Sequence, residues 1–226
     1  MEKKSLTGKL FIKHISFWPN LSEREKEYIN AHTKLVKYSA GEHVHQGPLD
    51  CLGVFLVKSG QLRVYTMSEE GREVTLYRLF PDDVGVLTAA CVLEAVTFDV
   101  YVDAEEPTEV LLTDSEAFKK LADSNIYVRA FGYEMAANRL SEMLWKMQQV
   151  LFLSADRRLA LFLVEESEQK NTTEIHLTHE QIARFMGTAR EVVSRLVKYF
   201  QQEGWIKTAR GCIKILDKAA LQKLAG

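Results

Sequence analysis

Four polar residues near position 190 have the side chains and the spacing needed to read DNA bases. Arg190, Glu191, Ser194 and Arg195 lie at i, i+1, i+4 and i+5, which groups them near the N-terminal end of one side of a helix. Arginine can donate two hydrogen bonds to guanine, and glutamate can accept one from cytosine. These residues therefore predict a helix that enters a DNA major groove. The alternative is an exposed helix in which Glu191 and Arg195 form an ordinary ion pair.

Two helix-start signals, ten residues apart, indicate how these side chains are positioned. Thr178 is followed three residues later by Gln181, and Thr188 is followed by Glu191 at the same spacing. Each threonine is expected to form a capping box, in which the hydroxyl and the later side chain bond reciprocally to backbone N–H groups. Gly187 can adopt the left-handed conformation that ends the first helix. The spacing predicts a helix-turn-helix.

A β-hairpin is expected directly after the helix-turn-helix of residues 177–206. Residues 205–206 and 213–215 have the pattern of short strands, and residues 209–211 contain the turn glycine. This layout is typical of a winged helix-turn-helix. We expect DNA contacts from Thr178, Thr188, Arg190, Glu191, Ser194, Arg195, Lys198 and Arg210.

The chain of 226 residues is long enough for two modest domains, and its charge is unevenly distributed. The whole sequence has a formal net charge of −2, yet residues 154–226 carry twelve Lys and Arg against nine Asp and Glu. Residues 176–226 carry nine against four. A basic segment beside an acidic remainder favours phosphate contact by one domain only.

The sequence also bears on location and on metal sites. It has no apolar run of the length that a transmembrane helix needs, and its N-terminus lacks the features of a secretory signal. Cys51, Cys91 and Cys212 are far apart and match neither a disulfide framework nor a CxxC metal pattern. We therefore expect a cytoplasmic protein with no membrane partner and no metal site.

Residues 34–114 have the pattern of many short strands. Three apolar or alternating runs lie between residues 52 and 80, separated by turns at residues 59–60 and 70–71. A further strand pair is expected near residues 97–102 and 109–113. Short strands at this spacing predict a β-sandwich or barrel.

His43 and His45 are two residues apart on one expected strand, so their imidazoles should share a face. Such a pair could bind a metal, but the sequence offers no evident third ligand. A surface or structural role is the simpler interpretation.

A long helix is expected over residues 125–153, with two apolar stripes. Val128, Phe131 and Met135 form one stripe, which would pack on the strand domain. The other has the 3–4 spacing of a coiled coil and predicts a parallel homodimer. The alternative is a helix buried wholly within one chain. The expected dimer interface is Ile126, Ala130, Tyr133, Ala137, Leu140, Leu144, Met147 and Leu151.

A hinge is expected at residues 153–156. Ser154 can cap a helix from Arg157 to about Ser167, and Asp156 suits its first turn. The sequence therefore predicts two domains. Residues 1–153 would form an effector-sensing domain that includes the dimerisation helix, and residues 154–226 would form the DNA-binding domain.

This order of elements resembles the CRP/FNR family of bacterial transcription regulators. The helix-turn-helix and wing carry the resemblance, together with turn glycines at Gly41, Gly47, Gly60, Gly71 and Gly85. It implies an α+β protein with an N-terminal jelly roll like a cyclic-nucleotide-binding domain, a long dimerisation helix and a C-terminal winged helix-turn-helix. It also implies a homodimer that regulates transcription at near-palindromic DNA together with RNA polymerase.

The resemblance includes features of two branches of the family. Glu191, Ser194 and Arg195 are similar to the FNR branch, whose half-sites are of the TTGAT type, whereas Arg190 is shared with the CRP branch. The half-site sequence therefore stays open.

The residues that would bind cyclic AMP in this family are replaced. The family's Gly-Glu pair corresponds to Gly85-Val86, and its phosphate-binding arginine falls near Phe98, beside Asp99, which would repel a phosphate. We therefore expect that cyclic AMP is not the effector. A small apolar or aromatic effector fits the expected pocket of Val86, Leu87, Cys91, Phe98, Met143 and Leu144.

The sequence also bears on two other cofactors. An FNR-type iron–sulfur cluster is not expected, because the sequence has no cysteine before Cys51 and only three dispersed cysteines. A haem-based gas or redox sensor stays open, as does a pocket filled by its own side chains. The axial ligands available to a haem are His14, His32, His43 and His45.

The sequence gives little support to two other function classes. An enzyme could use Cys91 as a nucleophile, but no motif places a base beside it, and there is neither a phosphate-binding glycine loop nor an HExxH motif. We therefore expect that the protein is not an enzyme. An effector-binding module acting through a protein partner would leave the outward pair Arg190 and Arg195 without a role.

Overall fold

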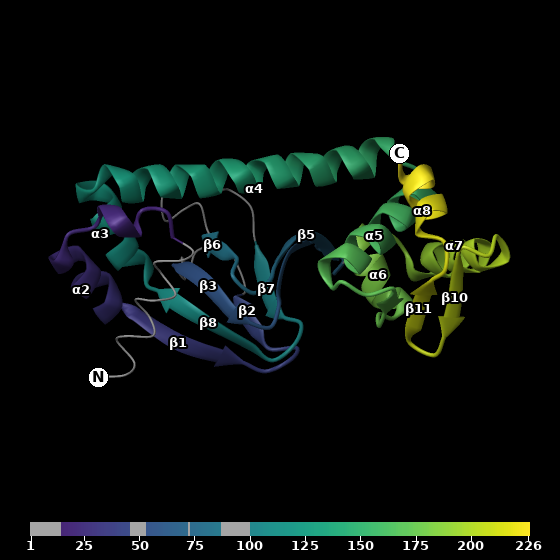
Figure 1. The fold of residues 1–226 in the computed structure, drawn as a ribbon, viewed down its shortest axis with the longest axis horizontal. Helices are drawn as coiled ribbons and strands as arrows, with labels where there is room; N and C mark the ends of the chain where they lie inside the picture. Colours follow the sequence, from purple (N-terminus) through teal and green to yellow (C-terminus); the bar gives the residue numbers. More distant parts are fainter. Residues whose placement is uncertain (1–14, 46–52, 72, 87–99) are drawn as a thin grey trace. The chain divides into compact units, whose positions relative to one another are not determined.

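The computed structural model describes residues 15–45, 53–71, 73–86 and 100–226. The chain forms two compact units (Figure 1). The first comprises residues 1–70 and 76–143, and the second comprises residues 71–75 and 144–226.

The first unit contains two four-stranded antiparallel sheets. One has the order β1 (Thr33–Tyr38), β8 (Thr108–Thr113), β3 (Val54–Ser59) and β6 (Val84–Val86). The other has the order β2 (His43–His45), β7 (Tyr101–Ala104), β4 (Leu62–Met67) and β5 (Glu73–Leu79). Residues 73–75 of β5 belong to the second unit. The core combines residues of both sheets, including Phe55, Leu62, Val102 and Val110, which are inaccessible to solvent. Two sheets that share an apolar core form the sandwich that the sequence predicts.

The last two strands of this sandwich do not pair with each other, contrary to the expectation of a strand pair. β8 lies between β1 and β3, whereas β7 lies between β2 and β4 in the other sheet. The chain therefore crosses from one sheet to the other between residues 104 and 108. Consecutive strands often change sheets in this way in a jelly roll. Each strand then pairs with neighbours that are distant in sequence.

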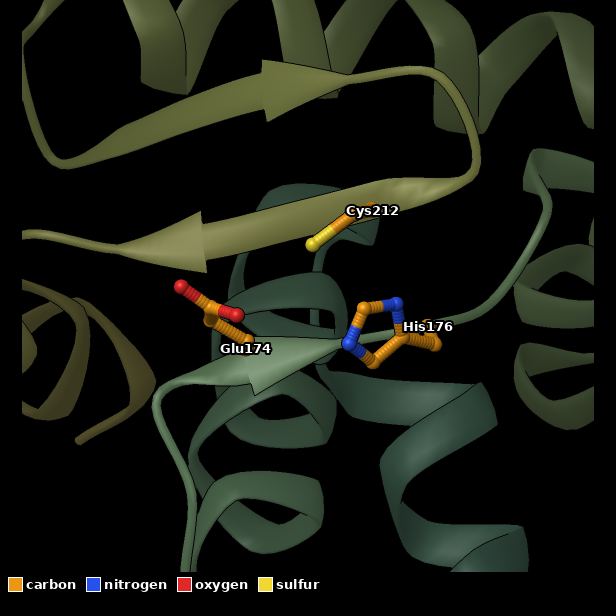
Figure 2. A group of neighbouring side chains, drawn as sticks. All are labelled: Glu174, His176 and Cys212. Atoms are coloured by element: carbon orange, nitrogen blue, oxygen red, sulfur yellow. The ribbon is translucent and has the colours of Figure 1, made fainter.

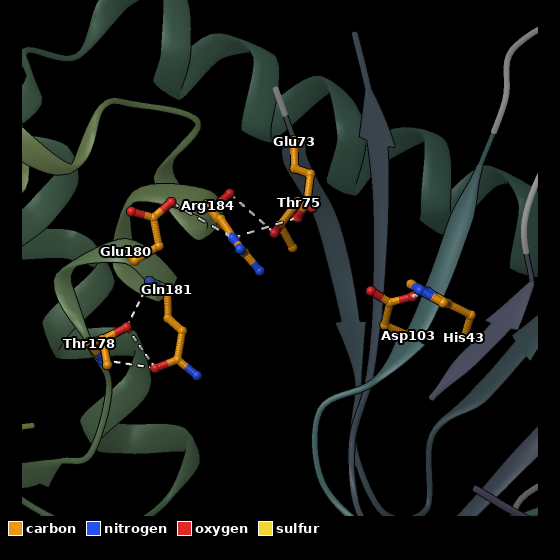
Figure 3. Close-up of polar contacts among 8 residues, drawn as sticks. All are labelled: His43, Glu73, Thr75, Asp103, Thr178, Glu180, Gln181 and Arg184. Atoms are coloured by element: carbon orange, nitrogen blue, oxygen red, sulfur yellow. Dashed lines mark hydrogen bonds and ion pairs between the residues drawn. The ribbon is translucent and has the colours of Figure 1, made fainter. Parts of the chain in front are cut away.

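The two histidines of β2 do not share a face. The pairing of β2 with β7 shifts register between His43 and His45, which is the mark of a β-bulge. His43 is exposed, and its Nδ1 lies 2.7 Å from the Asp103 carboxylate (Figure 3), whereas His45 is buried. A shared metal site on this strand, which strict alternation would allow, is therefore not formed.

Short helices cover a second apolar cluster in this unit. They are η1 (Trp18–Asn20), α2 (Glu23–Ala31) and α3 (Ser115–Ser124). The long helix α4 (Ile126–Phe152) follows α3. Phe17, Trp18, Ile29 and Phe118 are buried in this cluster with parts of β3 and β8. α4 lies within one residue of the expected bounds at each end.

The two stripes of α4 differ in burial as expected. Val128 and Phe131 are buried in the helix-covered cluster, and Met135 packs against it. The residues at the positions of the expected coiled coil are all exposed, and Ile126 is 64% and Leu151 is 63% accessible. Apolar side chains of this size normally lie inside a protein or an interface.

The second unit contains α5 (Ala155–Gln169), β9 (Glu174–Ile175), α6 (His179–Met186), α7 (Arg190–Gln202), β10 (Ile206–Ala209), β11 (Cys212–Ile215) and α8 (Lys218–Ala225). Its core includes Leu159, Leu163, Ile182, Val193 and Phe200. β10, β11 and β9 form a three-stranded antiparallel sheet, in which β9 is an additional strand that the sequence analysis did not assign.

The start of α5 differs from the expectation in one detail. Ser154 occupies the N-cap position, but its side chain makes no capping hydrogen bond to the backbone. Instead it bonds to the Asp156 carboxylate, and this hydrogen bond lowers the pKa of Asp156. The helix is also longer than expected at both ends.

Among the described residues, none of the helices combines the length and the apolarity required to cross a membrane.

Candidate nucleic-acid interface

α6 begins at the first expected capping box. The Thr178 hydroxyl accepts a hydrogen bond from the Gln181 backbone N–H at 3.2 Å. In return the Gln181 side-chain oxygen accepts one from the Thr178 N–H at 2.8 Å (Figure 3). These bonds satisfy two backbone donors that the helix itself leaves without partners, so they define where α6 starts.

The turn after α6 corrects the second expected capping box. Gly187 is left-handed, with φ of +63°, and the Thr188 N–H donates to the Ala183 carbonyl at 3.0 Å. Thr188 is therefore used to close the turn, and the N-cap of α7 is Ala189, whose side chain cannot cap. Because α7 starts one residue later than expected, Glu191 lies at its second position, where a capping box requires the third.

The packing of the two helices follows from small and apolar residues on their facing sides. Ala183 is buried on α6 together with Ile182 and Met186, and Val193 is buried on α7. Leu196 packs against the same cluster while partly accessible. This apolar seam sets which side of α7 faces outward.

Charged residues cover the outward side of α7. Arg190, Glu191, Arg195 and Lys198, four of the expected DNA contacts, are all exposed. Ser194 is half-buried among them. The first turns of α7 thus present two guanidinium groups and one carboxylate to solvent.

Ser194 has a partner that the sequence analysis missed. His179, in the first turn of α6, places its Nδ1 2.9 Å from the Ser194 hydroxyl. The two residues are fifteen positions apart, and only the helix crossing brings them together. This contact links the start of α6 to the exposed side of α7.

A cleft of about 610 Å³ lies beside this contact, between the two helices and the wing, which we define as the hairpin of β10 and β11. It brings together four of the expected DNA contacts, Thr178, Arg190, Ser194 and Lys198. Thr188, Glu191, Arg195 and Arg210 are not among its lining residues. The cleft also contains His179 and Gln201, which the sequence analysis did not single out.

The wing has the strands and the turn that were expected. Gly211 has a φ of +70° in the turn, and the neighbouring Arg210 is exposed there. The Thr208 hydroxyl donates to the Gln201 side-chain oxygen at 2.6 Å, which attaches the wing to α7. This hydrogen bond holds the wing beside α7.

One ion pair lies on the sheet that includes the wing. Lys214 on β11 donates to Glu174 on β9 at 2.8 Å. This bond lowers the pKa of the Glu174 carboxyl and raises the pKa of the Lys214 ammonium group. Both groups are exposed, so the pair adds little to stability.

Most of the expected effector pocket lies outside the described residues. Leu87, Cys91 and Phe98 lie outside the described residues, and so does the side chain of Val86. Met143 is half-buried and Leu144 is exposed on α4.

The candidate haem ligands can be described only in part. His14 lies outside the described residues. His32 places its Nδ1 2.8 Å from the Tyr28 carbonyl oxygen, and its ring lies against the Tyr28 ring. His43 contacts Asp103, as described above.

Comparison with known proteins finds a matching domain model for each unit. A model of the Crp-like helix-turn-helix domain matches residues 157–224, and a model of the cyclic nucleotide-binding domain matches residues 35–125. The sequence of this chain is 38% identical to that of a CRP/FNR-family transcriptional regulator from Eubacterium rectale whose crystal structure is known. The match covers 94% of this chain and 99% of that one, with a TM-score of 0.88.

Two curated relatives come from different branches. The transcriptional activator protein FnrA of Stutzerimonas stutzeri is 27% identical over 184 residues, which cover 76% of this chain and 72% of the relative. The cyclic AMP receptor protein of Thermus thermophilus is 26% identical over 189 residues, covering 83% and 86%. The 38% identity to the Eubacterium rectale regulator over nearly the whole of both chains, together with the matches to both domain models, shows the family. The chain belongs to the CRP/FNR family of DNA-binding transcription regulators.

Proposed function

We propose that this regulator binds DNA as a parallel homodimer joined along α4. The observation that carries the proposal is the stripe of eight exposed apolar residues on that helix, from Ile126 to Leu151. A stripe with this spacing is stable in water when a second helix covers it. The exposed Ala130 and Ala137 would allow close approach of the two helices.

The dimer would present two copies of α7 to DNA. Recognition helices of such dimers lie roughly 34–36 Å apart, one turn of B-DNA, so that a two-fold symmetric protein selects a near-palindromic site. Arg190, Glu191 and Arg195 have the exposure and the chemistry to contact base edges.

The remaining contacts would hold the DNA backbone. We expect phosphate contacts from Thr178 and Lys198, which line the cleft, and from Arg210, which is exposed at the wing turn. Ser194, held by His179, and Thr188, in the turn before α7, complete the proposed interface. RNA polymerase would be the partner at the promoter, in the cytoplasm.

Selection of DNA sites from a random duplex library tests this proposal. The full-length protein should enrich a two-fold symmetric sequence with half-site centres about 10 base pairs apart. Its affinity for that site should fall steeply with salt, because bound phosphates release counterions. Enrichment of an asymmetric sequence would contradict the dimer. An affinity that does not change with salt would favour a module that acts through a protein partner.

The proposed effector is a small apolar or aromatic molecule rather than cyclic AMP. The family's ribose-binding glutamate and phosphate-binding arginine correspond to Val86 and to the neighbourhood of Phe98 and Asp99. An unpaired phosphate beside such residues would be strongly disfavoured. The effector would act by shifting the packing of Val128, Phe131 and Met135, to the extent that it binds one arrangement of α4 more tightly than another.

Isothermal titration calorimetry with cyclic AMP tests the first part of this proposal. No heat of binding is expected at micromolar nucleotide, because neither the ribose nor the phosphate has its partner. A saturable micromolar isotherm would overturn it. The cyclic AMP receptor protein of Thermus thermophilus, titrated under the same conditions, is a suitable comparison.

A further inference from the structure

Three potential metal ligands meet on the sheet formed by β9, β11 and β10. Glu174 lies on β9, His176 follows that strand directly, and Cys212 begins β11. Their ligand atoms, a carboxylate oxygen, an imidazole nitrogen and the thiol sulfur, all lie within 4.8 Å of one another (Figure 2). We propose that these three side chains bind a divalent metal ion with the chemistry of Zn²⁺.

The strand register explains why the three side chains meet. Ile213 pairs with Ile175, and both are buried in the core below the sheet. Residues on either side of a buried strand residue point to the opposite face. Glu174, His176 and Cys212 therefore share the outer face, with His176 and Cys212 at neighbouring positions across the two strands.

The donor set selects the metal. Thiolate and imidazole ligands favour Zn²⁺ over hard ions such as Mg²⁺ and Ca²⁺, and a carboxylate is a common third ligand. Zinc bonds of about 2.0–2.3 Å place tetrahedral ligand atoms roughly 3.3–3.8 Å apart. Glu174 and His176 are exposed, so rotation about their side-chain bonds can bring the ligands to that separation.

The charge balance also permits a cation at this position. Lys214 contacts Glu174 through Oε1, which leaves the second carboxylate oxygen available for a metal. A thiolate and a carboxylate together outweigh the single ammonium group. The Lys214 side chain is 50% exposed and the Glu174 side chain is 46% exposed, and ion pairs with this exposure are weak.

Cys212 itself is better explained as a ligand than as a packing residue. It is a free thiol that is only partly buried. Unpaired cysteines are usually among the most buried residues, where they pack as small apolar side chains. At the start of β11 the thiol instead lies beside an imidazole and a carboxylate, which are metal-binding groups.

Cobalt spectroscopy on the full-length protein tests this site. The C51S/C91S variant, in which Cys212 is the remaining thiol, would be freed of metal with a chelator and titrated with Co²⁺. One equivalent per chain should produce a thiolate-to-cobalt charge-transfer band, and Zn²⁺ should abolish it by displacement. Absence of the band from this folded variant would overturn the proposal.

Ligand variants and a matched histidine control sharpen the test. Adding Cys212→Ser should remove the band. His176→Gln or Glu174→Gln should weaken Zn²⁺ binding by at least as much as loss of an outer-shell partner, which costs roughly 10- to 100-fold. His32→Gln, in the other unit, should leave binding unchanged. If the C51S/C91S background does not fold, comparing H176Q with H32Q in the otherwise unaltered chain gives the same distinction. A band that survives C212S, or a Zn²⁺ affinity that H176Q leaves unchanged, would overturn the proposal.

Discussion

Leu140→Glu is expected to convert the proposed dimer to monomers at micromolar concentration. Leu140 is 55% exposed at the middle of the α4 stripe, so its replacement disturbs little within one chain. In a parallel dimer it would place two carboxylates opposite each other. Loss of two buried leucines, at about 1.5–3 kcal/mol each, predicts a dimer dissociation constant raised by roughly 10²- to 10⁴-fold. Sedimentation velocity would measure the change.

Asn138→Glu is the matched control, because residue 138 is exposed on α4 but lies outside the stripe. It should remain dimeric and bind the selected DNA site normally. The L140E monomer should lose affinity for the full palindrome, since it can contact only one half-site at a time. Dimeric L140E with unchanged DNA affinity would show that the exposed stripe serves another partner.

Arg195→Ala is expected to weaken binding to the selected site by about 1–3 kcal/mol, or roughly 5- to 150-fold. Arg195 is exposed on the outward side of α7, where a guanidinium can donate two hydrogen bonds to a guanine. The variant should also tolerate other bases at one position of each half-site, which a phosphate-binding residue would not cause. Competition assays with singly substituted duplexes would measure both effects.

Lys223→Ala provides a charge-matched control, because Lys223 is exposed on α8 and lies outside the proposed interface. It should preserve the base preference at every position of the site. If R195A and K223A bind all duplexes alike and as tightly as the unaltered protein, Arg195 does not read bases. Binding that weakens equally for all sequences would place Arg195 on a phosphate.

The elements could be predicted where local rules are strong. Thr178 and Gln181 satisfy backbone donors within one helical turn, and Gly187 and Gly211 allow left-handed turns, so each marks a boundary regardless of the rest of the fold. The periodicity of α4 likewise separated the buried stripe from the exposed one, because helical spacing alone determines which residues share a face. The sequence was sufficient for the fold class and for the exposed residues of α7.

Other features depended on contacts between distant segments, which spacing cannot reveal. Thr188 lies in the turn that Gly187 closes, so α7 begins one residue later than expected and its N-cap is Ala189. His43 and His45 lie on different faces because the pairing of β2 with β7 contains a bulge. The link between His179 and Ser194 arises from the crossing of α6 and α7.

The cluster of Glu174, His176 and Cys212 also depends on contacts between distant segments, and it is the clearest example. Two of its members are separated from the third by more than thirty residues, so no short sequence motif contains all three. Local hydrogen bonding and periodicity were sufficient to predict α4, the start of α6 and the wing turn from the sequence alone. Strand register and helix crossing, which depend on packing across the whole unit, decided which side chains meet.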